Sequence, residues 1–167
     1  MRSPARFVSC TAVGAALLLG TTLAFAQASG CTPLGSQPVT PNVDYYQQIQ
    51  PIWEQSCANC HVNHGGGPSA GLDLDLDWSW SNLFEVGSAI APGRVMAVPG
   101  SAATSFLFEK INCGTPTVGE LMPRGRLPIP AAEQALIRDW LNQGAREAPD
   151  VRLFGNGFEP VSAAAPR

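Results

Sequence analysis

Clusters of lysine or arginine are absent from the 167-residue sequence, and charged residues make up only 14% of it. The formal net charge is −3. A protein that binds nucleic acid or an anionic membrane surface needs a basic patch to do so. The composition therefore argues against both kinds of partner and favours partner proteins with a neutral or basic face.

Long hydrophobic runs are also absent. The most apolar stretch, Val13 to Leu23, is too short and too early in the chain to span a membrane. It follows the basic residues Arg2 and Arg6 and precedes the small-residue cleavage site Ala24-Phe25-Ala26. This order is typical of a secretory signal peptide. We therefore expect residues 1–26 to be an export signal, the mature chain to have no transmembrane segment, and the protein to be periplasmic or secreted.

A second processing signal follows the first. Ala28-Ser29-Gly30 before Cys31 resembles a lipoprotein box, but its first position is alanine rather than leucine. It also lies some distance after the apolar run. Cleavage at the first signal is therefore favoured over lipid anchoring at Cys31.

Cysteine is scarce, with five in the chain, and Cys10 lies within the export signal. Two others belong to the run Cys57-Ala58-Asn59-Cys60-His61, which has the Cys-x-x-Cys-His spacing of c-type haem attachment. Thiols three positions apart reach the two vinyl groups on one porphyrin edge, and the next histidine lies under the iron. We therefore expect one covalent haem c, bound through thioethers at Cys57 and Cys60 and ligated by His61.

Other uses of paired cysteines lack the features that they need. A thioredoxin-like redox pair does not require the adjacent histidine and expects a βαβ surround, which the sequence does not indicate. A four-ligand zinc site requires a second ligand pair at short spacing, and none follows. A two-haem peroxidase is disfavoured because only one Cys-x-x-Cys-His run is present.

The last two cysteines, Cys31 and Cys113, are left to pair in an oxidising compartment once haem takes the other two. A disulfide between them closes a long loop, which in the chain-entropy model stabilises a fold by about 4 kcal/mol. The alternative is a lipidated Cys31 with a free or partner-linked Cys113.

Methionine is rare as well, with three in the chain. A six-coordinate haem needs a second ligand from its opposite face, and Met96, Met122 and His64 are the candidates. His64 is only three residues from His61, which is a poor reach around the porphyrin edge. Met96 lies in an apolar stretch where methionine usually fills a core. Met122 stands directly before Pro123 in a proline-stiffened loop, and we predict it to be the ligand.

His/Met ligation limits what the haem can do. A thioether is a soft, neutral ligand that favours ferrous iron, and with both faces filled neither substrate nor oxygen has a place to bind. Outer-sphere electron exchange through the haem edge remains. Arg124 and Arg126 follow the predicted ligand and are candidate partners of the haem propionates, because guanidinium groups match carboxylates. Solvated surface charge is the competing interpretation.

The rest of the chain predicts short helices joined by long loops. Residues 27–41 are rich in Pro, Gly, Ser and Thr and are interpreted as an arm or linker. The alternating run 71–78 is interpreted as extended chain that leads into a short helix, with its leucines pointing inward. Apolar spacings of three and four predict further helices, from Tyr45 towards Cys57 with a kink or restart at Pro51, from Ser101 to Ile111, and from about 131 to 143.

Several pieces of the sequence are shared with a known family. They are Ile49-Gln50-Pro51-Ile52-Trp53, Gly71-Leu72-Asp73-Leu74, Val98-Pro99-Gly100, Leu121-Met122-Pro123, and Ile137-Arg138-Asp139-Trp140-Leu141 with Gly144-Ala145. Together with the haem-attachment run, they resemble a class I c-type cytochrome, and more narrowly the planctomycete-type cytochrome c domain of secreted bacterial proteins. The resemblance covers about residues 42–146 and leaves out the arm and the C-terminal tail, 147–167.

This resemblance implies an all-α fold, in which a small helical domain with long Gly/Pro-rich loops wraps around one covalently attached haem. The first and last helices are expected to pack against each other near the haem. It also implies that Cys57 and Cys60 are thioether sites and that His61 and Met122 are the axial ligands.

The sequence therefore predicts an exported monohaem c-type cytochrome that carries single electrons between redox partner proteins and is not an enzyme. The first alternative is a haem enzyme or gas sensor in which Met122 is a labile distal ligand. The second is a haem-containing interaction module of a larger secreted redox complex.

Overall fold

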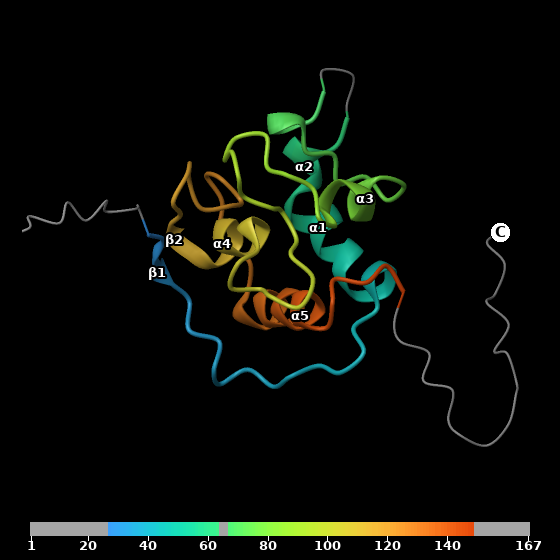
Figure 1. The fold of residues 1–167 in the computed structure, drawn as a ribbon, viewed down its shortest axis with the longest axis vertical. Coiled ribbons are helices and arrows are strands. Elements are labelled where there is room, and N and C mark those ends of the chain that lie inside the picture. Colours follow the sequence, from blue (N-terminus) through green and yellow to red (C-terminus); the bar gives the residue numbers. More distant parts are fainter. Residues whose placement is uncertain (1–26, 64–66, 149–167) are drawn as a thin grey trace, which may run out of the picture.

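The computed structural model describes residues 27–63 and 67–148. The expected export signal, the candidate ligand His64 and most of the C-terminal tail lie outside these ranges. In chain order the elements are β1 (Ser29–Cys31), η1 (Tyr45–Ile49), α1 (Gln50–Ser56), α2 (Ala58–His61), η2 (Ser69–Gly71), α3 (Ser79–Leu83), α4 (Phe106–Asn112), β2 (Cys113–Thr115) and α5 (Ala131–Asn142) (Figure 1).

The expectation of an all-α fold is wrong. β1 and β2 form a two-stranded antiparallel sheet in which Ser29 faces Thr115 and Cys31 faces Cys113. The fold is therefore mixed α/β, with short helices, this small sheet and long loops. Strands of three residues are too short for an alternating pattern to reveal. Helical periodicity was consequently the dominant signal in the sequence.

Cys31 and Cys113 form a disulfide across that sheet. Cys113 directly follows α4, so the bond ties the N-terminal arm to the end of this helix. A sulfur atom in a disulfide has no valence left for a lipid. The structure therefore favours the disulfide over lipid anchoring at Cys31.

The arm is fastened along α5 rather than extended as a free linker, and Figure 1 shows it passing beside this helix. The backbone N–H of Thr40 donates to Oδ2 of Asp139 (2.8 Å), and that of Val43 donates to Oε1 of Gln143 (2.9 Å). Nε2 of Gln143 in turn donates to the carbonyl oxygen of Thr40 (2.6 Å). Asp139 in α5 and Gln143 just after it thus satisfy backbone groups at the end of the arm and directly after it.

The first helical stretch changes type where its proline lies. η1 is a π-helix, and it continues into α1 at Gln50, with Pro51 in the first α-helical turn. Proline is tolerated there because the amide that it lacks would have no partner within the helix. Asp44 caps the stretch, since its side chain accepts from the backbone N–H of Gln47 (2.9 Å).

The first and last helices meet through their aromatic side chains. The Tyr45 and Trp140 rings have centroids 5.1 Å apart, and Nε1 of Trp53 donates to the Tyr45 hydroxyl (3.1 Å). All three side chains are at most 1% exposed. Full burial of each aromatic side chain stabilises the fold by about 1.5–3 kcal/mol, so this contact anchors the core.

The alternating run is extended chain that leads into α3, as expected, but its leucines do not share one environment. Leu74 is 2% exposed, whereas Leu76 is 49% exposed. The expected inward orientation therefore fails at Leu76. No helix among residues 27–63 and 67–148 has both the length and the apolar character that a membrane crossing requires.

Candidate functional site

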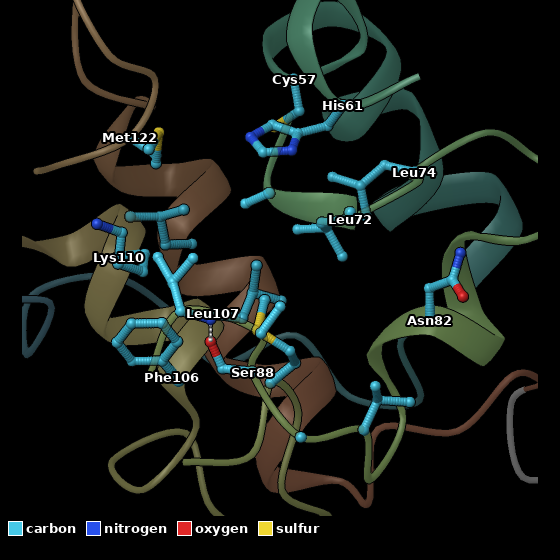
Figure 2. Close-up of a pocket in the computed structure, with 18 residues that line it drawn as sticks. Cys57, His61, Leu72, Leu74, Asn82, Ser88, Phe106, Leu107, Lys110 and Met122 are labelled. Atoms are coloured by element: carbon cyan, nitrogen blue, oxygen red, sulfur yellow. Dashed lines mark hydrogen bonds between the residues drawn. The ribbon is translucent and has the colours of Figure 1, made fainter. Parts of the chain in front are cut away.

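A pocket opens between α2, α4 and three loops, one of which carries Met122 (Figure 2). Its volume is about 150 Å³, and it is partly open to solvent. Much of the wall is apolar, with side chains that include Leu72, Leu74, Ile90, Phe106, Leu107 and Ile111.

The predicted haem-attachment residues lie on the single turn α2. The backbone N–H groups of Cys60 and His61 both donate to the carbonyl oxygen of Cys57, at 3.1 and 2.9 Å. Residues three and four apart are neighbours on a helix surface, so Cys60 and His61 each lie next to Cys57. Cys57 and His61 line the pocket, whereas Cys60 is exposed and lies outside its lining.

Burial sets the chemistry of the Cys57 thiol. It raises the pKa of this thiol to about 12, and the nearby Cys60 adds to the increase. Disulfide exchange and metal binding both need a thiolate, so cysteines that perform them have lowered pKa values. In the described part of the chain, no group of three or more His, Cys, Asp or Glu side chains is placed to hold a metal ion. The raised pKa of Cys57 weighs against the redox-pair interpretation.

His61 extends from the end of α2 into the pocket (Figure 2). Its backbone is fixed, because its carbonyl oxygen accepts from the N–H of Leu74 (2.6 Å). Its Nδ1 atom is buried and has no hydrogen-bond partner among the described residues. A buried nitrogen without a partner is costly, and native proteins rarely leave one. The imidazole therefore has unused bonding capacity at the pocket wall.

Met122 reaches the same pocket from the loop between β2 and α5 (Figure 2). Its backbone N–H donates to the carbonyl oxygen of Lys110 on α4 (2.7 Å). Met96 also lines the pocket, but it is 8% exposed and belongs to the hydrophobic core. The structure thus brings Cys57, His61 and Met122 together, and it places the rejected candidate Met96 beside them.

The two candidate propionate partners, Arg124 and Arg126, are not among the residues that line the pocket. Nε of Arg124 pairs with Oε2 of Glu120 (2.7 Å), and both side chains are exposed. Arg126 faces Asn59 in the haem-attachment run. With the Asn59 amide oriented so that its oxygen faces the guanidinium, this oxygen accepts from Nη1 (3.0 Å) and Nη2 (2.5 Å) of Arg126. The loop after Met122 therefore contacts the attachment run.

Lys110 is a pocket residue that sequence reasoning missed. It is the only lysine in the chain, and it is 6% exposed. Burial lowers the pKa of its ammonium, and the nearby carboxylates of Glu109 and Glu120 partly oppose this change. A sequence signal for it did exist. Lysine three residues after Leu107 lies on the same helix face, so periodicity places it on the buried side of α4.

The chemistry of the pocket has to be inferred from its own residues, because comparison with family models, curated proteins and solved structures gave no match. A thiol, an imidazole and a thioether surround an apolar space. Thioether and imidazole groups are axial ligands of haem iron, and paired thiols attach the porphyrin covalently. The donor set and the apolar wall fit a haem.

Proposed function

We propose that this protein is an exported monohaem c-type cytochrome that carries single electrons. The observation that supports this most strongly is the meeting of Cys57, His61 and Met122 at one apolar pocket. The attachment run and the methionine are far apart in the sequence. Their meeting gives one pocket a candidate attachment thiol and two candidate axial ligands.

Each of these residues has a definable task. Cys57 and Cys60 would attach the haem covalently, and His61 and Met122 would be its axial ligands. When bound, the haem supplies a one-electron redox centre. The backbone hydrogen bond from Leu74 to His61 holds the imidazole in place, and the backbone hydrogen bond from Met122 to α4 holds the thioether.

The surroundings of the pocket would favour the reduced state of a bound haem. Apolar side chains at the pocket wall would lower the local dielectric, which disfavours the extra positive charge of ferric iron. A neutral thioether ligand acts in the same direction. A cytochrome of relatively high potential is the expected result.

The proposal includes a location and a class of partner. The disulfide between Cys31 and Cys113 fits an oxidising compartment, such as the periplasm or the extracellular space. The mature chain would exchange electrons with redox proteins that present a neutral or basic face, since its own charge is negative.

The test is to produce the full chain in a host that exports it and attaches haem. We expect the intact mass to contain one haem, and we expect the ferrous protein to bind carbon monoxide slowly at neutral pH. The double variant Cys57→Ser, Cys60→Ser should contain no covalent haem. Rapid carbon monoxide binding would show an open iron position and would favour a gas sensor or haem enzyme instead.

A further inference from the structure

We propose that Lys110 is the positioning residue that holds Met122 at the pocket. This inference rests on the proposed function, because it assumes that Met122 is the second ligand of a haem. Figure 2 shows Lys110 on the side of the pocket from which Met122 enters. The residue acts through the loop backbone and need not touch the haem.

Three hydrogen bonds join Lys110 to the loop that ends at Met122. Its Nζ donates to the carbonyl oxygens of Val118 (2.9 Å) and Glu120. Its own carbonyl oxygen accepts from the backbone N–H of Met122 (2.7 Å). One residue of a helix thus fixes a five-residue span of loop, from Val118 to Met122, at three points.

The loop is shaped to pass around the ammonium. A Cβ atom on Gly119 would lie 2.9 Å from Nζ of Lys110, and Gly119 has a φ of +71°. The left-handed conformation favours glycine, and a side chain at position 119 would have to displace the Lys110 ammonium. The carbonyl groups on either side of Gly119 can therefore turn toward the ammonium together.

The chemistry of a buried ammonium makes this attachment strong. Hydrogen bonds from a charged donor are about twice as strong as neutral ones, and low dielectric strengthens them further. Lys110 makes these contacts from the buried face of α4, and the residue is only 6% exposed to solvent. A neutral side chain of the same length would fill the space without holding the carbonyls.

The preceding residue on α4 provides a matched control. Glu109 accepts from the backbone N–H and from the hydroxyl of Thr117, both at 2.6 Å, and from Nη2 of Arg94 at 2.7 Å. It therefore fastens the start of the same loop. Glu109 does not line the pocket and has no contact with Met122 among the described hydrogen bonds.

The experiment compares the haem-loaded full chain with its Lys110→Met and Glu109→Gln variants. Two readouts are taken, the far-red charge-transfer band from thioether to ferric iron and the amide hydrogen exchange of residues 118–122. In Lys110→Met we expect the band to weaken or vanish and exchange to accelerate by about tenfold or more, since two charge-assisted hydrogen bonds are lost. In Glu109→Gln we expect the band to remain.

A second variant approaches the same contact from the loop, in case Lys110→Met fails to fold. Gly119→Ala places a methyl group against Nζ and should weaken the band as well. Adding Lys110→Met to it should cause little further loss, because the two changes break one shared contact.

Three results would overturn the inference. The first is a Lys110→Met protein with the band and the loop exchange of the wild type. The second is equal loss of the band in Lys110→Met and Glu109→Gln, which would indicate general loosening of the loop. The third is an unchanged band in Gly119→Ala. A wild-type haem protein without the band would instead refute the proposed His/Met ligation itself, and with it this role for Lys110.

Discussion

Two methionine side chains line the pocket, and their surroundings distinguish their roles. Met96 is 8% exposed and sits within the hydrophobic core, where its backbone N–H donates to Val86 (2.8 Å) and its carbonyl accepts from Leu107 (3.0 Å). Met122 is half-buried and lies on a loop. A core methionine fills volume, whereas a loop methionine at a pocket wall is free to take a ligand role.

Truncation of these two side chains should therefore have different consequences. Met122→Ala should open the iron and allow carbon monoxide to bind the ferrous protein rapidly, with a modest loss of stability. Met96→Ala should leave carbon monoxide binding slow and lower the free energy of unfolding by about 2–5 kcal/mol, as core truncations do. Stopped-flow mixing and urea unfolding measure the two effects. Rapid carbon monoxide binding in Met96→Ala, together with slow binding in Met122→Ala, would identify Met96 as the ligand.

Glu109 makes the stability of the protein depend on pH. Burial alone would raise the pKa of this carboxyl group, but hydrogen bonds from Thr117 and the Arg94 guanidinium outweigh burial and lower it. A carboxyl group with a lower pKa in the folded state stabilises the fold above its unfolded pKa of about 4.5. That stabilisation is lost as the pH falls through the folded pKa.

We therefore expect the difference in melting temperature between the wild type and Glu109→Gln to be largest near neutral pH. It should shrink as the pH falls below the unfolded pKa and through the lower folded pKa of Glu109, where the carboxylate becomes protonated. Thermal unfolding of both proteins at a series of pH values measures this difference. A difference that stays constant down to low pH would show that the Glu109 charge does not contribute.

Residues with a fixed spacing could be singled out from the sequence, and residues defined by their surroundings could not. The Cys-x-x-Cys-His spacing singled out Cys57, Cys60 and His61, of which Cys57 and His61 line the pocket. Lys110 was missed because a single lysine has no motif, and its importance comes from the carbonyl groups of a distant loop. Arg124 was a candidate for the pocket, but it is paired with Glu120 on the surface.

At the scale of elements, the arm and α4 are linked by β1, β2 and the disulfide between Cys31 and Cys113. The disulfide closes a loop across a sequence separation of 82 residues. α4 carries Lys110 and Ile111 into the pocket wall, so the disulfide anchors one end of a pocket helix.

Removal of this disulfide should destabilise the protein considerably. In the chain-entropy model, Cys31→Ala with Cys113→Ala lowers the free energy of unfolding by about 4 kcal/mol. Urea unfolding of the haem-loaded proteins measures this free energy. A reductant should lower it in the wild type and leave it unchanged in the variant. An unaffected free energy of unfolding would show that the bond is absent or contributes nothing.

Hydrophobic periodicity predicted the helices well where no side chain competes for the hydrogen bonds of the backbone. The last helix was expected at about 131–143, and α5 spans Ala131–Asn142. α4 begins at Phe106, later than the expected start at Ser101. The reason is that Ser105 Oγ donates to the carbonyl oxygen of Ser101 (2.7 Å) and accepts from the N–H of Val98 (2.9 Å), which favours turns.

For the whole molecule, the pocket belongs to no single segment. Its wall is assembled from α2, α4 and loops that are remote from one another in the chain. The sequence could indicate the candidate ligand residues but not the cavity, because a cavity depends on the distances between segments that are remote in the chain.

A bound haem should therefore stabilise the whole fold. The haem-free Cys57→Ser, Cys60→Ser variant leaves apolar walls and the His61 imidazole without the group that they fit. Its melting temperature should be about 10 °C below that of the haem-loaded protein, the shift expected for a stabilisation of several kcal/mol in a chain of this size. Equal melting temperatures for the two proteins would mean that haem makes no stabilising contact with the folded pocket.

The far-red absorption spectrum of the ferric, full-length protein tests the proposed redox centre most directly. A haem ligated by His61 and Met122 predicts a charge-transfer band from thioether to iron, which persists in Met96→Ala and disappears in Met122→Ala. A wild-type spectrum without this band, or a band that survives in Met122→Ala, would contradict the closed His/Met centre.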